Sequence, residues 1–411
     1  MHHRTDIVFF TLFRSDNVYS SVSLSMAKEL ARHHRVFYVN HPYSYKDVVS
    51  GWRAGDPALR QRLPAMMKGQ VHVEHLQHNL TVFQPRMTLP INWMPTGKVY
   101  NFFKKQNDRR VLQAIRFALQ AYHVRDFIYI NCYDPFFVGS LPASFGARLG
   151  IYHCIDDISQ NPYTARHGVR LEQAAAAEAD LTFVTSTNLK KLLQPYARNI
   201  ETFFNAVDIS VFSRVRTEQF PRPPELAGRT GAVIGFIGNM DELRVDYPLI
   251  KAVAQAHPDK TLLLVGPVNS PEPQALGLDR MPNVVFAGPR RLDELPPLLQ
   301  HMDVALIPFL LNTLTRSIYP LKINEYLAAG KPVVSTSFSD DIRGFGDVIY
   351  LSETPEAFIR NIDRAIAEHN PEREIARVRV AESNTWTARI AQLWAIAERY
   401  AAKAPAEPQP A

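Results

Sequence analysis

Cysteine is scarce in this chain of 411 residues, which contains only Cys132 and Cys154. Two cysteines cannot build the disulfide framework of a small secreted domain, so we expect a reducing, cytoplasmic environment. No apolar run approaches the roughly 20 residues that a membrane-spanning helix needs. The first apolar stretch, at 7–12, is short and is soon followed by Arg14, which predicts a buried strand and no secretory signal.

Two common functional motifs are also missing. No Gly-x-Gly-x-x-Gly sequence follows the first strand, which argues against a dinucleotide-binding domain. The histidines between His72 and His78 have neither the His-Glu-x-x-His spacing nor a cysteine partner, so they predict a short strand and turn. We therefore expect no metal site and no cofactor. The modest formal charge of +6 gives no reason to expect a nucleic-acid partner.

The length of the chain exceeds that of one typical domain and suits two domains of about 200 residues each. Hydrophobic residues make up 46% of the chain, which is enough for two packed cores. Apolar strand-like runs alternate with helix-like segments in both halves. This alternation predicts an α/β fold of doubly wound sheets.

The predicted boundaries follow from composition and from the strand pattern. An N-terminal Rossmann-like domain covers 1–212, and a proline-rich linker covers 213–230. A C-terminal Rossmann-like domain covers 231–384. A final helix at 385–402 and a disordered tail at 403–411 complete the chain.

The expected elements are short apolar runs and amphipathic segments. In the first domain, strands are predicted at 6–12, 36–39, 126–130, 149–155 and 180–185, and helices at 20–33 and 98–123. In the second domain, strands are predicted at 232–237, 262–265, 284–286, 304–307, from 333 and at 349–352, and helices at 321–329 and 355–369.

The most informative stretch is 319–336, which predicts a loop, a helix, a turn and a strand. Pro320 suits the first helical position, because its missing N–H would have no partner there. Residues 321–329 are rich in helix formers, and Gly330 suits the left-handed residue that ends a helix.

Lys322 and Glu325 lie three positions apart and therefore share one face near the start of this helix. The face offers a cation, a carboxylate, free backbone N–H groups and the positive end of the helix dipole. Such a set suits a phosphorylated sugar ligand, because the donors bind phosphate and the carboxylate accepts hydrogen bonds from paired hydroxyls. The alternative is an ordinary salt bridge on a solvated helix face.

The order Pro-x-Lys-x-x-Glu-Tyr-Leu-Ala-x-Gly-Lys-Pro-Val-Val closely resembles the donor-site motif of GT-B glycosyltransferases, in particular retaining family four and the teichuronic-acid-type enzymes near it. The resemblance implies two facing doubly wound domains, with a C-terminal helix that crosses back to the first. It implies that Glu325 binds the ribose hydroxyls of a nucleotide-diphosphate sugar, and that Lys322 and the preceding loop hold its diphosphate. Many members carry a second glutamate for the donor sugar, and Ser317 stands at that position here.

The other donor-binding candidates are loop residues and residues at the start of this helix. The turn after the strand at 232–237 is expected to approach the nucleotide closely. The complete predicted donor-binding set is Gly238, Asn239, Arg316, Ser317, Ile318, Leu321, Lys322 and Glu325.

In the first domain, polar residues follow buried strands, where ligands of open α/β sheets bind. Asn131, His153, Asp156 and Asp157 are expected to gather at this edge. We take His153 and Asp156 as catalytic candidates. The alternative is that one aspartate caps a helix and that His153 is a satisfied interior residue.

Residues 98–125 hold seven Lys or Arg residues against one Asp, a formal charge of +6. Aromatic residues lie within and just before this segment, and the combination suits an anionic membrane surface. The predicted acceptor or membrane face consists of Arg14, Lys104, Lys105, Arg109 and Arg110. The alternative is an ordinary amphipathic helix with its cations in water.

Together, the resemblance and these residues predict a retaining, metal-independent glycosyltransferase of cell-surface polysaccharide synthesis. Its donor is a nucleotide-diphosphate sugar, and its acceptor is a glycan or a lipid-linked glycan. We expect a cytoplasmic protein, peripheral at the inner face of the membrane if the acceptor is lipid-linked. A sugar-nucleotide epimerase on the same fold and a catalytically silent binding protein are the alternatives.

Overall fold

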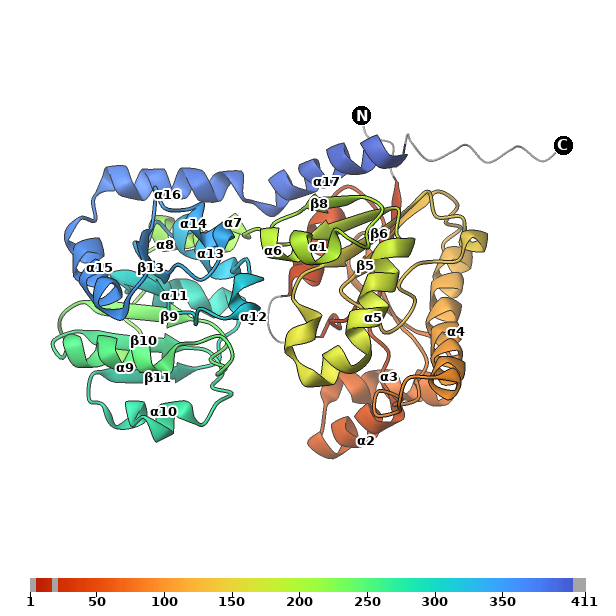
Figure 1. The fold of residues 1–411 in the computed structure, drawn as a ribbon, viewed down its shortest axis with the longest axis horizontal. Coiled ribbons are helices and arrows are strands. Elements are labelled where there is room, and N and C mark those ends of the chain that lie inside the picture. Colours follow the sequence, from red (N-terminus) through yellow and green to blue (C-terminus); the bar gives the residue numbers. More distant parts are fainter. Residues whose placement is uncertain (1–4, 17–20, 402–411) are drawn as a thin grey trace. The chain divides into compact units, whose positions relative to one another are not determined.

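The computed structural model describes residues 5–16 and 21–401. The predicted tail at 403–411 lies outside the described residues. The chain forms two compact units, which Figure 1 shows as ribbons. Unit 1 consists of Met1–Thr185, Leu189–Phe203 and Ile390–Ala411, and unit 2 consists of Ser186–Asn188 and Phe204–Arg389.

Unit 1 is built on an eight-stranded sheet in the order β3-β4-β2-β1-β5-β6-β7-β8. Every neighbouring pair is parallel except β3 and β4. Its strands are β1 (Asp6–Thr11), β2 (Val36–Val39), β3 (His72–Gln77), β4 (Leu80–Gln84), β5 (Phe127–Cys132), β6 (Leu149–Cys154), β7 (Leu181–Val184) and β8 (Ile200–Thr202). Its helices are α1 (Val22–Leu30), α2 (Tyr45–Ala54), α3 (Pro57–Met67), α4 (Lys98–Ala121), η1 (Ala143–Phe145), η2 (Ile158–Gln160), α5 (Pro162–Glu178) and α6 (Thr187–Leu193), whose first two residues belong to unit 2.

Unit 2 is built on a six-stranded, wholly parallel sheet in the order β11-β10-β9-β12-β13-β14. Its strands are β9 (Val233–Ile237), β10 (Thr261–Val265), β11 (Val284–Gly288), β12 (Val304–Ile307), β13 (Val333–Thr336) and β14 (Tyr350–Ser352). Its first helices are α7 (Ile209–Phe212), α8 (Arg214–Thr217), η3 (Pro224–Leu226), α9 (Tyr247–Ala256), α10 (Glu272–Ala275), η4 (Leu278–Arg280), η5 (Leu292–Glu294) and α11 (Leu295–Gln300). The later ones are α12 (Thr313–Arg316), α13 (Leu321–Ala328), α14 (Asp340–Arg343), α15 (Pro355–Ala367) and α16 (Pro371–Ser383), and α17 (Trp386–Ala401) begins in unit 2 but lies mostly in unit 1.

The strand order reverses once in each sheet, between β1 and β5 in unit 1 and between β9 and β12 in unit 2. The central strands are buried along their whole length, as expected for a parallel sheet with helices on both faces. In such sheets ligands bind beyond the carboxyl ends of the strands, at the reversal. Each unit therefore offers one such place.

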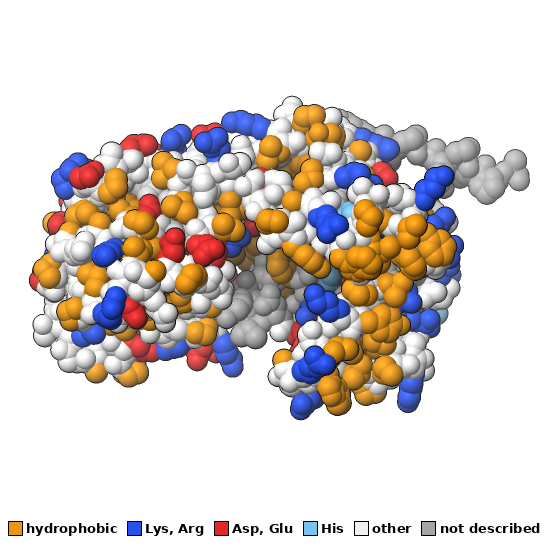
Figure 2. Space-filling model, turned by 60° about the horizontal axis from the view of Figure 1, so that its bottom comes forward, with side chains coloured by type: hydrophobic (Ala, Val, Ile, Leu, Met, Phe, Trp, Pro, Cys, Tyr) orange, Lys and Arg blue, Asp and Glu red, His pale blue; other side chains and the backbone are white. Residues whose placement is uncertain are grey.

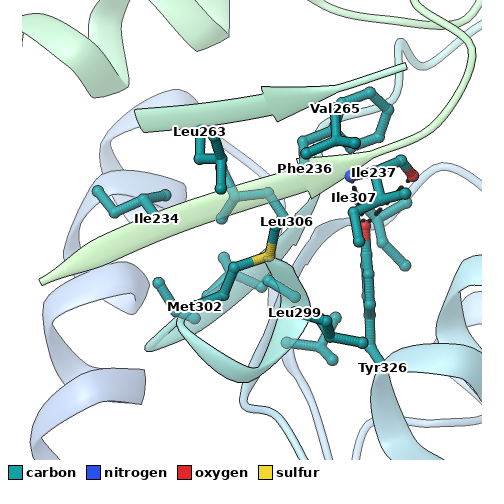
Figure 3. Packing of buried hydrophobic residues seen from close by; sticks show 14 of the residues in the cluster. Ile234, Phe236, Ile237, Leu263, Val265, Leu299, Met302, Leu306, Ile307 and Tyr326 are labelled. Atoms are coloured by element: carbon teal, nitrogen blue, oxygen red, sulfur yellow. Dashed lines mark hydrogen bonds between the residues drawn. The ribbon is translucent and has the colours of Figure 1, made fainter. Parts of the chain in front are cut away.

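The core of unit 2 packs tightly around β9 (Figure 3). Gly235 lies in the middle of this strand, and a Cβ atom there would lie 2.0 Å from Sδ of Met302. The missing side chain therefore makes room for Met302, which packs against β9. Because protein interiors are close-packed, a larger residue at position 235 would displace this side chain.

The predicted α/β fold and every predicted strand are confirmed, with strand ends that differ by at most two residues. The boundary between the units differs from the prediction, because unit 2 already begins at Phe204. The segment predicted as a linker, 213–230, forms α8 and η3 and buries Val215 and Leu226 in the core of unit 2. Its prolines give it the composition of a linker, but they do not keep its apolar side chains from packing.

The helix predicted at 385–402 corresponds to α17, which begins in unit 2 and belongs to unit 1 from Ile390 onward. The ring of Trp394 packs on His34, with 4.5 Å between the ring centroids. The Tyr400 hydroxyl donates to Glu201 at 3.1 Å. These contacts confirm that the final helix returns to the first unit.

Candidate functional site

Helix α13 follows β12, one of the two strands at the reversal of unit 2, and precedes β13 in the chain. Pro320 is its N-cap residue, one position earlier than predicted, and no side chain of the described residues caps its first turn. The helix ends as predicted at Gly330, whose φ is +72° and whose Cβ, if present, would lie 2.6 Å from Cγ of Glu374. The uncapped start leaves the N–H groups of Leu321 and Lys322 without helical partners, which is the arrangement that favours an anion.

Lys322 and Glu325 form an ion pair, with 3.1 Å between Nζ and Oε2. The Glu325 side chain is 8% exposed, and that of Lys322 is 24% exposed. The pair therefore does not lie on a solvated helix face, as the alternative interpretation required. One cation satisfies only part of the acceptor capacity of a carboxylate, so Glu325 can accept further hydrogen bonds from a ligand.

Tyr326 fixes this helix to the end of β9. Its hydroxyl accepts a hydrogen bond from the N–H of Ile237 at 2.8 Å and donates to the Ile237 carbonyl at 3.3 Å (Figure 3). Burial raises the pKa of Tyr326, so the hydroxyl keeps its proton. Because Ile237 directly precedes Gly238, these bonds tie the second half of α13 to the strand end just before the turn after β9.

The turn after β9 is compact. The N–H of Gly238 donates to the Val265 carbonyl at 2.9 Å, and a Cβ atom on Gly266 would lie 1.9 Å from the Gly238 carbonyl oxygen. A Cβ atom on Gly238 itself would lie 2.9 Å from the Phe236 ring, which is a local reason for glycine there. Asn239 is exposed and accepts a hydrogen bond from Asn269 at 2.8 Å. The predicted approach of a nucleotide to Gly238 and Asn239 stays a prediction.

The predicted donor-binding residues in the loop before α13 differ in how far their side chains are exposed. Arg316 is exposed and forms no ion pair with any described residue, so its guanidinium is available. Ile318 is half-buried. Ser317 is fully buried, and its hydroxyl accepts a hydrogen bond from Asn188 at 2.8 Å. The Ser317 side chain therefore serves the packing of unit 2, and the predicted binding of the diphosphate by the loop around Ser317 and Ile318 stays a prediction.

Two asparagines that the sequence analysis did not single out hold this loop in place. Asn205 donates to the Tyr319 carbonyl at 2.9 Å, and Asn324 donates to the Asn205 carbonyl at 3.3 Å. Phe204 stacks on the Tyr319 ring, with 4.9 Å between the centroids. The only sequence signal for this role is the asparagine residue type, because amide side chains can satisfy loop carbonyls. The sequence around Asn205 indicated only a domain boundary.

His153 is an interior residue of β6. It is fully buried, its Nδ1 lies 3.7 Å from Sγ of Cys132, and the rings of Phe183 and Phe203 meet it edge-on. Burial lowers its pKa to about 3, so the imidazole is neutral at physiological pH. The structure thus makes His153 a core histidine, but not the satisfied one of the alternative interpretation, because its Nε2 has no hydrogen-bond partner among the described residues.

The aspartates after β6 organise a turn. Asp157 is the N-cap of η2 and accepts from the Ser159 N–H at 3.0 Å, which confirms a capping role for one of the pair. Asp156 is half-buried and accepts from the N–H of Asp157 at 2.9 Å. Its oxygen thereby helps to fix the turn, and the catalytic role of Asp156 stays a prediction.

The predicted basic face is only partly exposed. Lys104 pairs with Asp108 at 2.8 Å, and Arg110 donates to the Met87 carbonyl; both side chains are half-buried. Arg14 is also half-buried, with its guanidinium 4.0 Å from the centroid of the Tyr43 ring. Of the five predicted residues, only Lys105 and Arg109 are exposed.

Apolar side chains accompany these cations. Figure 2 shows a face of unit 1 on which hydrophobic side chains gather among those of Lys and Arg. Trp93 is 69% exposed, and Val99 and Phe102, in the first turns of α4, are 61% and 59% exposed. Aromatic residues near α4 are thus not all in the core, as the amphipathic-helix alternative required.

Two further features were sought among the described residues. They contain no group of three or more His, Cys, Asp or Glu side chains that could hold a metal ion. None of their helices is both long enough and apolar enough to span a membrane.

A pocket of about 350 Å³ in unit 2 lies away from α13. Val233, Asp303 and Lys331 line it, and these residues begin or precede β9, β12 and β13. The pocket therefore lies at the amino edge of the sheet, opposite the edge where ligands of open α/β sheets bind. We do not assign it to the donor.

Residues 231–368 match the family of Glycosyl transferases group 1. The protein described as "Putative teichuronic acid biosynthesis glycosyltransferase TuaH", from Bacillus subtilis (strain 168), is 30% identical over 209 residues. That alignment covers 49% of this chain and 52% of TuaH, so the chain spans about half the length of the curated relative it matches.

Solved structures match nearly the whole chain. The α,α-trehalose 6-phosphate synthase of Burkholderia multivorans superposes with a TM-score of 0.67 at 10% identity, covering 98% of this chain and 99% of the synthase. HepE from Anabaena, solved in complex with UDP, superposes with a TM-score of 0.62 at 18% identity, covering 96% of this chain and all of HepE. At such identities the likeness shows the fold, and the fold is GT-B.

Proposed function

We propose that this chain, which carries a glycosyl transferases group 1 domain at 231–368, is a glycosyltransferase of cell-surface polysaccharide synthesis. It moves a sugar from a nucleotide-diphosphate sugar to a glycan or lipid-linked acceptor. The observation that carries the proposal is the ion pair of the half-buried Lys322 with the buried Glu325 at the uncapped start of α13. The UDP complex of HepE and the description of TuaH support the donor class and the pathway class.

The chemistry of donor binding follows from the charges at this edge. Glu325 accepts hydrogen bonds from the two ribose hydroxyls, while Lys322 and the first N–H groups of α13 bind the diphosphate. As the bond to the sugar breaks, negative charge develops on the leaving diphosphate. Lys322, the helix dipole and the exposed Arg316 stabilise that charge, so this step is proposed to need no metal ion.

The stereochemical outcome rests on the resemblance, which implies retention. The family's second glutamate is Ser317 here, and its hydroxyl is occupied by Asn188. This chain therefore lacks one side chain that retaining members present to the donor sugar. The anomeric configuration of the product, read by NMR, decides between retention and inversion.

For the acceptor, we propose a lipid-linked glycan at an anionic membrane surface, with the protein peripheral to the cytoplasmic face. Lys105 and Arg109 supply exposed positive charge, and Trp93, Val99 and Phe102 supply exposed apolar surface nearby in the chain. Cations bind anionic headgroups, and apolar side chains enter the interface below them. A measurement of salt-sensitive binding to anionic vesicles tests the proposed membrane contact separately from donor binding.

The experiment that tests the proposed function follows UDP-glucose, UDP-N-acetylglucosamine and UDP-glucuronic acid by NMR in the presence of the full-length chain. A transferase releases UDP slowly to water, and at a donor concentration below the Kd of the variant Glu325→Gln should slow this release about tenfold to a hundredfold, since the donor binds more weakly. Glu382→Gln, at an exposed helical glutamate of unit 2, is the control and should behave like the wild type.

The two alternatives give different spectra in the same experiment. An epimerase converts the donor into a second nucleotide-sugar without releasing UDP. A silent binding protein binds a donor but leaves all three unchanged. Either result would contradict the transferase proposal.

A further inference from the structure

We infer that unit 2 binds a small phosphorylated sugar in the pocket of about 350 Å³ at the amino edge of its sheet. Lys331 and Arg222 hold the phosphate there, and Asp303 accepts a hydrogen bond from a sugar hydroxyl. The proposed donor site lies beyond the opposite edge of the same sheet, so the two sites are separate. The inference therefore goes beyond the proposed function and does not depend on it.

Lys331 is a cation that lacks a close counter-ion. It belongs to the Gly-Lys-Pro-Val-Val part of the sequence motif, which the proposed donor site does not use. Its side chain is half-buried, and Nζ donates to the Gln300 carbonyl at 2.8 Å but forms no ion pair with any described residue. An ammonium group has three hydrogens, so two of them remain for a ligand.

The electrostatic surroundings of Lys331 also favour an anion. Burial lowers the pKa of Lys331, because the ammonium group has lost water. The carboxylates of Asp303 and Glu374 act on it only from beyond ion-pair distance. A bound phosphate would supply the close negative charge that this partly buried cation lacks.

Two arginines add positive charge to the same place. Arg222 lines the pocket, and its Nε and Nη2 donate to the carbonyls of Leu226 and Arg229 at 3.2 and 3.1 Å. These bonds hold the guanidinium in position and leave Nη1 for a ligand. Arg377 is 1% exposed, and its Nε has no hydrogen-bond partner among the described residues. Neither arginine forms an ion pair within the described part of the chain, so their charge stays uncompensated.

His369 connects Arg377 to the pocket. It lines the pocket, and its Nδ1 lies 3.2 Å from Nη1 of Arg377. A guanidinium can only donate, so Nδ1 accepts and the neutral ring carries its hydrogen on Nε2. Burial and the charge of Arg377 lower the pKa of His369, which keeps the ring neutral at physiological pH. Nε2 lies 4.0 Å from Glu374, beyond hydrogen-bond distance, and its N–H is left for a ligand.

Asp303 gives the pocket an acceptor. One of its oxygens accepts from the Val233 N–H at 2.7 Å, and the other has no hydrogen-bond partner among the described residues. A carboxylate repels a bare anion but accepts hydrogen bonds from hydroxyl groups. The three cations named above outnumber the two carboxylates, Asp303 and Glu374. The pocket therefore favours an anion that also carries hydroxyl groups, and a phosphorylated sugar has both.

The size and the lining of the pocket suit such a ligand. A volume of about 350 Å³ lies near the lower end of the range of about 300–1,000 Å³ that is common for small-molecule sites. An apolar ligand would leave the polar groups of the lining unpaired. The polar and charged side chains of the lining are those of Arg222, Gln300, His301, Asp303, Lys331 and His369.

Calorimetry on the full-length chain tests the inference with three probes. Glucose 6-phosphate carries both the phosphate and the hydroxyls, inorganic phosphate carries only the anion, and glucose carries only the hydroxyls. Glucose 6-phosphate should bind saturably and more tightly than either of the others. No saturable binding of glucose 6-phosphate at millimolar concentration overturns the inference. Equal affinity for inorganic phosphate overturns the assignment to a sugar phosphate.

The charge of Lys331 is tested with Lys331→Met, which keeps most of the buried stem. The variant should bind glucose 6-phosphate about tenfold to a hundredfold more weakly, as expected for the loss of a charge-assisted hydrogen bond. Lys251→Met, at a half-buried lysine of α9, is the matched control and should bind like the wild type. Equal affinities in the two variants contradict the role of Lys331.

Asp303→Asn tests the acceptor. The variant keeps an oxygen for the Val233 N–H but removes the negative charge. Inorganic phosphate should then bind more tightly, because repulsion is lost. The preference for glucose 6-phosphate over inorganic phosphate should fall about tenfold, because the hydroxyl loses a charged acceptor. An unchanged preference contradicts the role of Asp303.

A readout on the unaltered binding residues covers the case in which Lys331→Met does not fold. In protein labelled with ¹⁵N-histidine, the Nε2 signal of His369 is the one that disappears in His369→Gln. Glucose 6-phosphate should shift this signal saturably in the otherwise unchanged chain. The absence of a shift overturns the inference.

UDP in the same samples separates this site from the donor site. Saturating UDP should leave the affinity for glucose 6-phosphate in place, and Lys331→Met should bind UDP like the wild type. Displacement of glucose 6-phosphate by UDP would mean that the probe binds at the donor site, which overturns the inference. If UDP itself does not bind, the proposed function fails, whereas saturable binding of glucose 6-phosphate that depends on Lys331 still supports this site.

Discussion

Units 1 and 2 share the same strand order around their reversals but place different chemistry there. Unit 2 presents a helix start with Lys322 and Glu325, which suits a charged, hydroxylated nucleotide. Unit 1 presents a pocket lined by aromatic rings, with His41 backed by the buried Asp134. The comparison teaches that topology fixes where a ligand binds, whereas the side chains at that edge fix which ligand it is.

The surfaces of the two units also differ, in the number of large hydrophobic side chains that they expose. Among the described residues, twelve large hydrophobic side chains are exposed in unit 1 and four in unit 2. Scattered apolar side chains are normal on a protein surface, but a gathering such as that near α4 marks an interaction site. Unit 1 is therefore the unit that we expect to contact an apolar partner.

The largest expected effect is on the free energy of unfolding, and it compares one glycine with positive φ in each unit. In Gly266→Ala of unit 2, the new Cβ would lie 1.9 Å from the Gly238 carbonyl oxygen, so we expect a loss of unfolding free energy on the order of 4 kcal/mol. In Gly146→Ala of unit 1, nothing lies within 4 Å, so only backbone strain of about 1 kcal/mol remains. Urea unfolding of both variants measures the difference. Equal losses would show that the turn after β9 can relax.

The next effect concerns the pH dependence of the stability of unit 1. Burial raises the pKa of Glu172 from 4.5 to about 7, and the Tyr152 hydroxyl donates to it at 2.9 Å. As pH rises from 4.5 to about 7, the unfolded chain releases this proton while the folded chain keeps it, so stability falls. The loss should total on the order of 3 kcal/mol and should be absent in Glu172→Gln. Chemical unfolding at several pH values measures it, and an identical pH slope in the variant would contradict the buried-acid account.

A smaller effect is expected on membrane binding, and it distinguishes the surface of unit 1 from the surface of unit 2. Each exposed cation near an anionic membrane contributes about 1 kcal/mol, so the double variant Lys105→Glu/Arg109→Glu should lose at least about 2 kcal/mol of binding to anionic vesicles. The matched reversal in unit 2 is Arg360→Glu/Arg379→Glu, at two exposed arginines, and it should change little. Co-sedimentation at low salt measures both. Equal losses would mean that net charge alone, rather than this face of unit 1, governs binding.

Much of the fold could be predicted from the sequence, because parallel strands buried on both faces appear as short apolar runs. Segments without that signal were missed, such as α2, α3 and β4. The linker at 213–230 was misjudged because proline content does not reveal whether Val215 and Leu226 are buried. Composition describes the chain locally, whereas burial depends on contacts distant in sequence.

The proposed donor site was predictable in part because Lys322 and Glu325 lie on one turn of one helix, where spacing alone brings them together. His41 and Asp134 lie 93 positions apart, and only the strand order brings them to one edge. His153 has the residue type of a catalyst, yet its place inside β6 makes it a core residue. The sequence shows the residue type but not how deeply each side chain lies in the sheet. It therefore could not distinguish His41 from the core residue His153.

The central claim is that α13 binds a nucleoside diphosphate through Lys322 and Glu325, and calorimetry with UDP tests it most directly. Glu325→Gln should lose about 1.5–3 kcal/mol, on the order of tenfold to a hundredfold in Kd, whereas the control Glu382→Gln should bind like the wild type. Lys322→Met should weaken UDP more than uridine, because its charge acts on the diphosphate. Unchanged UDP affinity in Glu325→Gln, with the fold intact, would contradict the account.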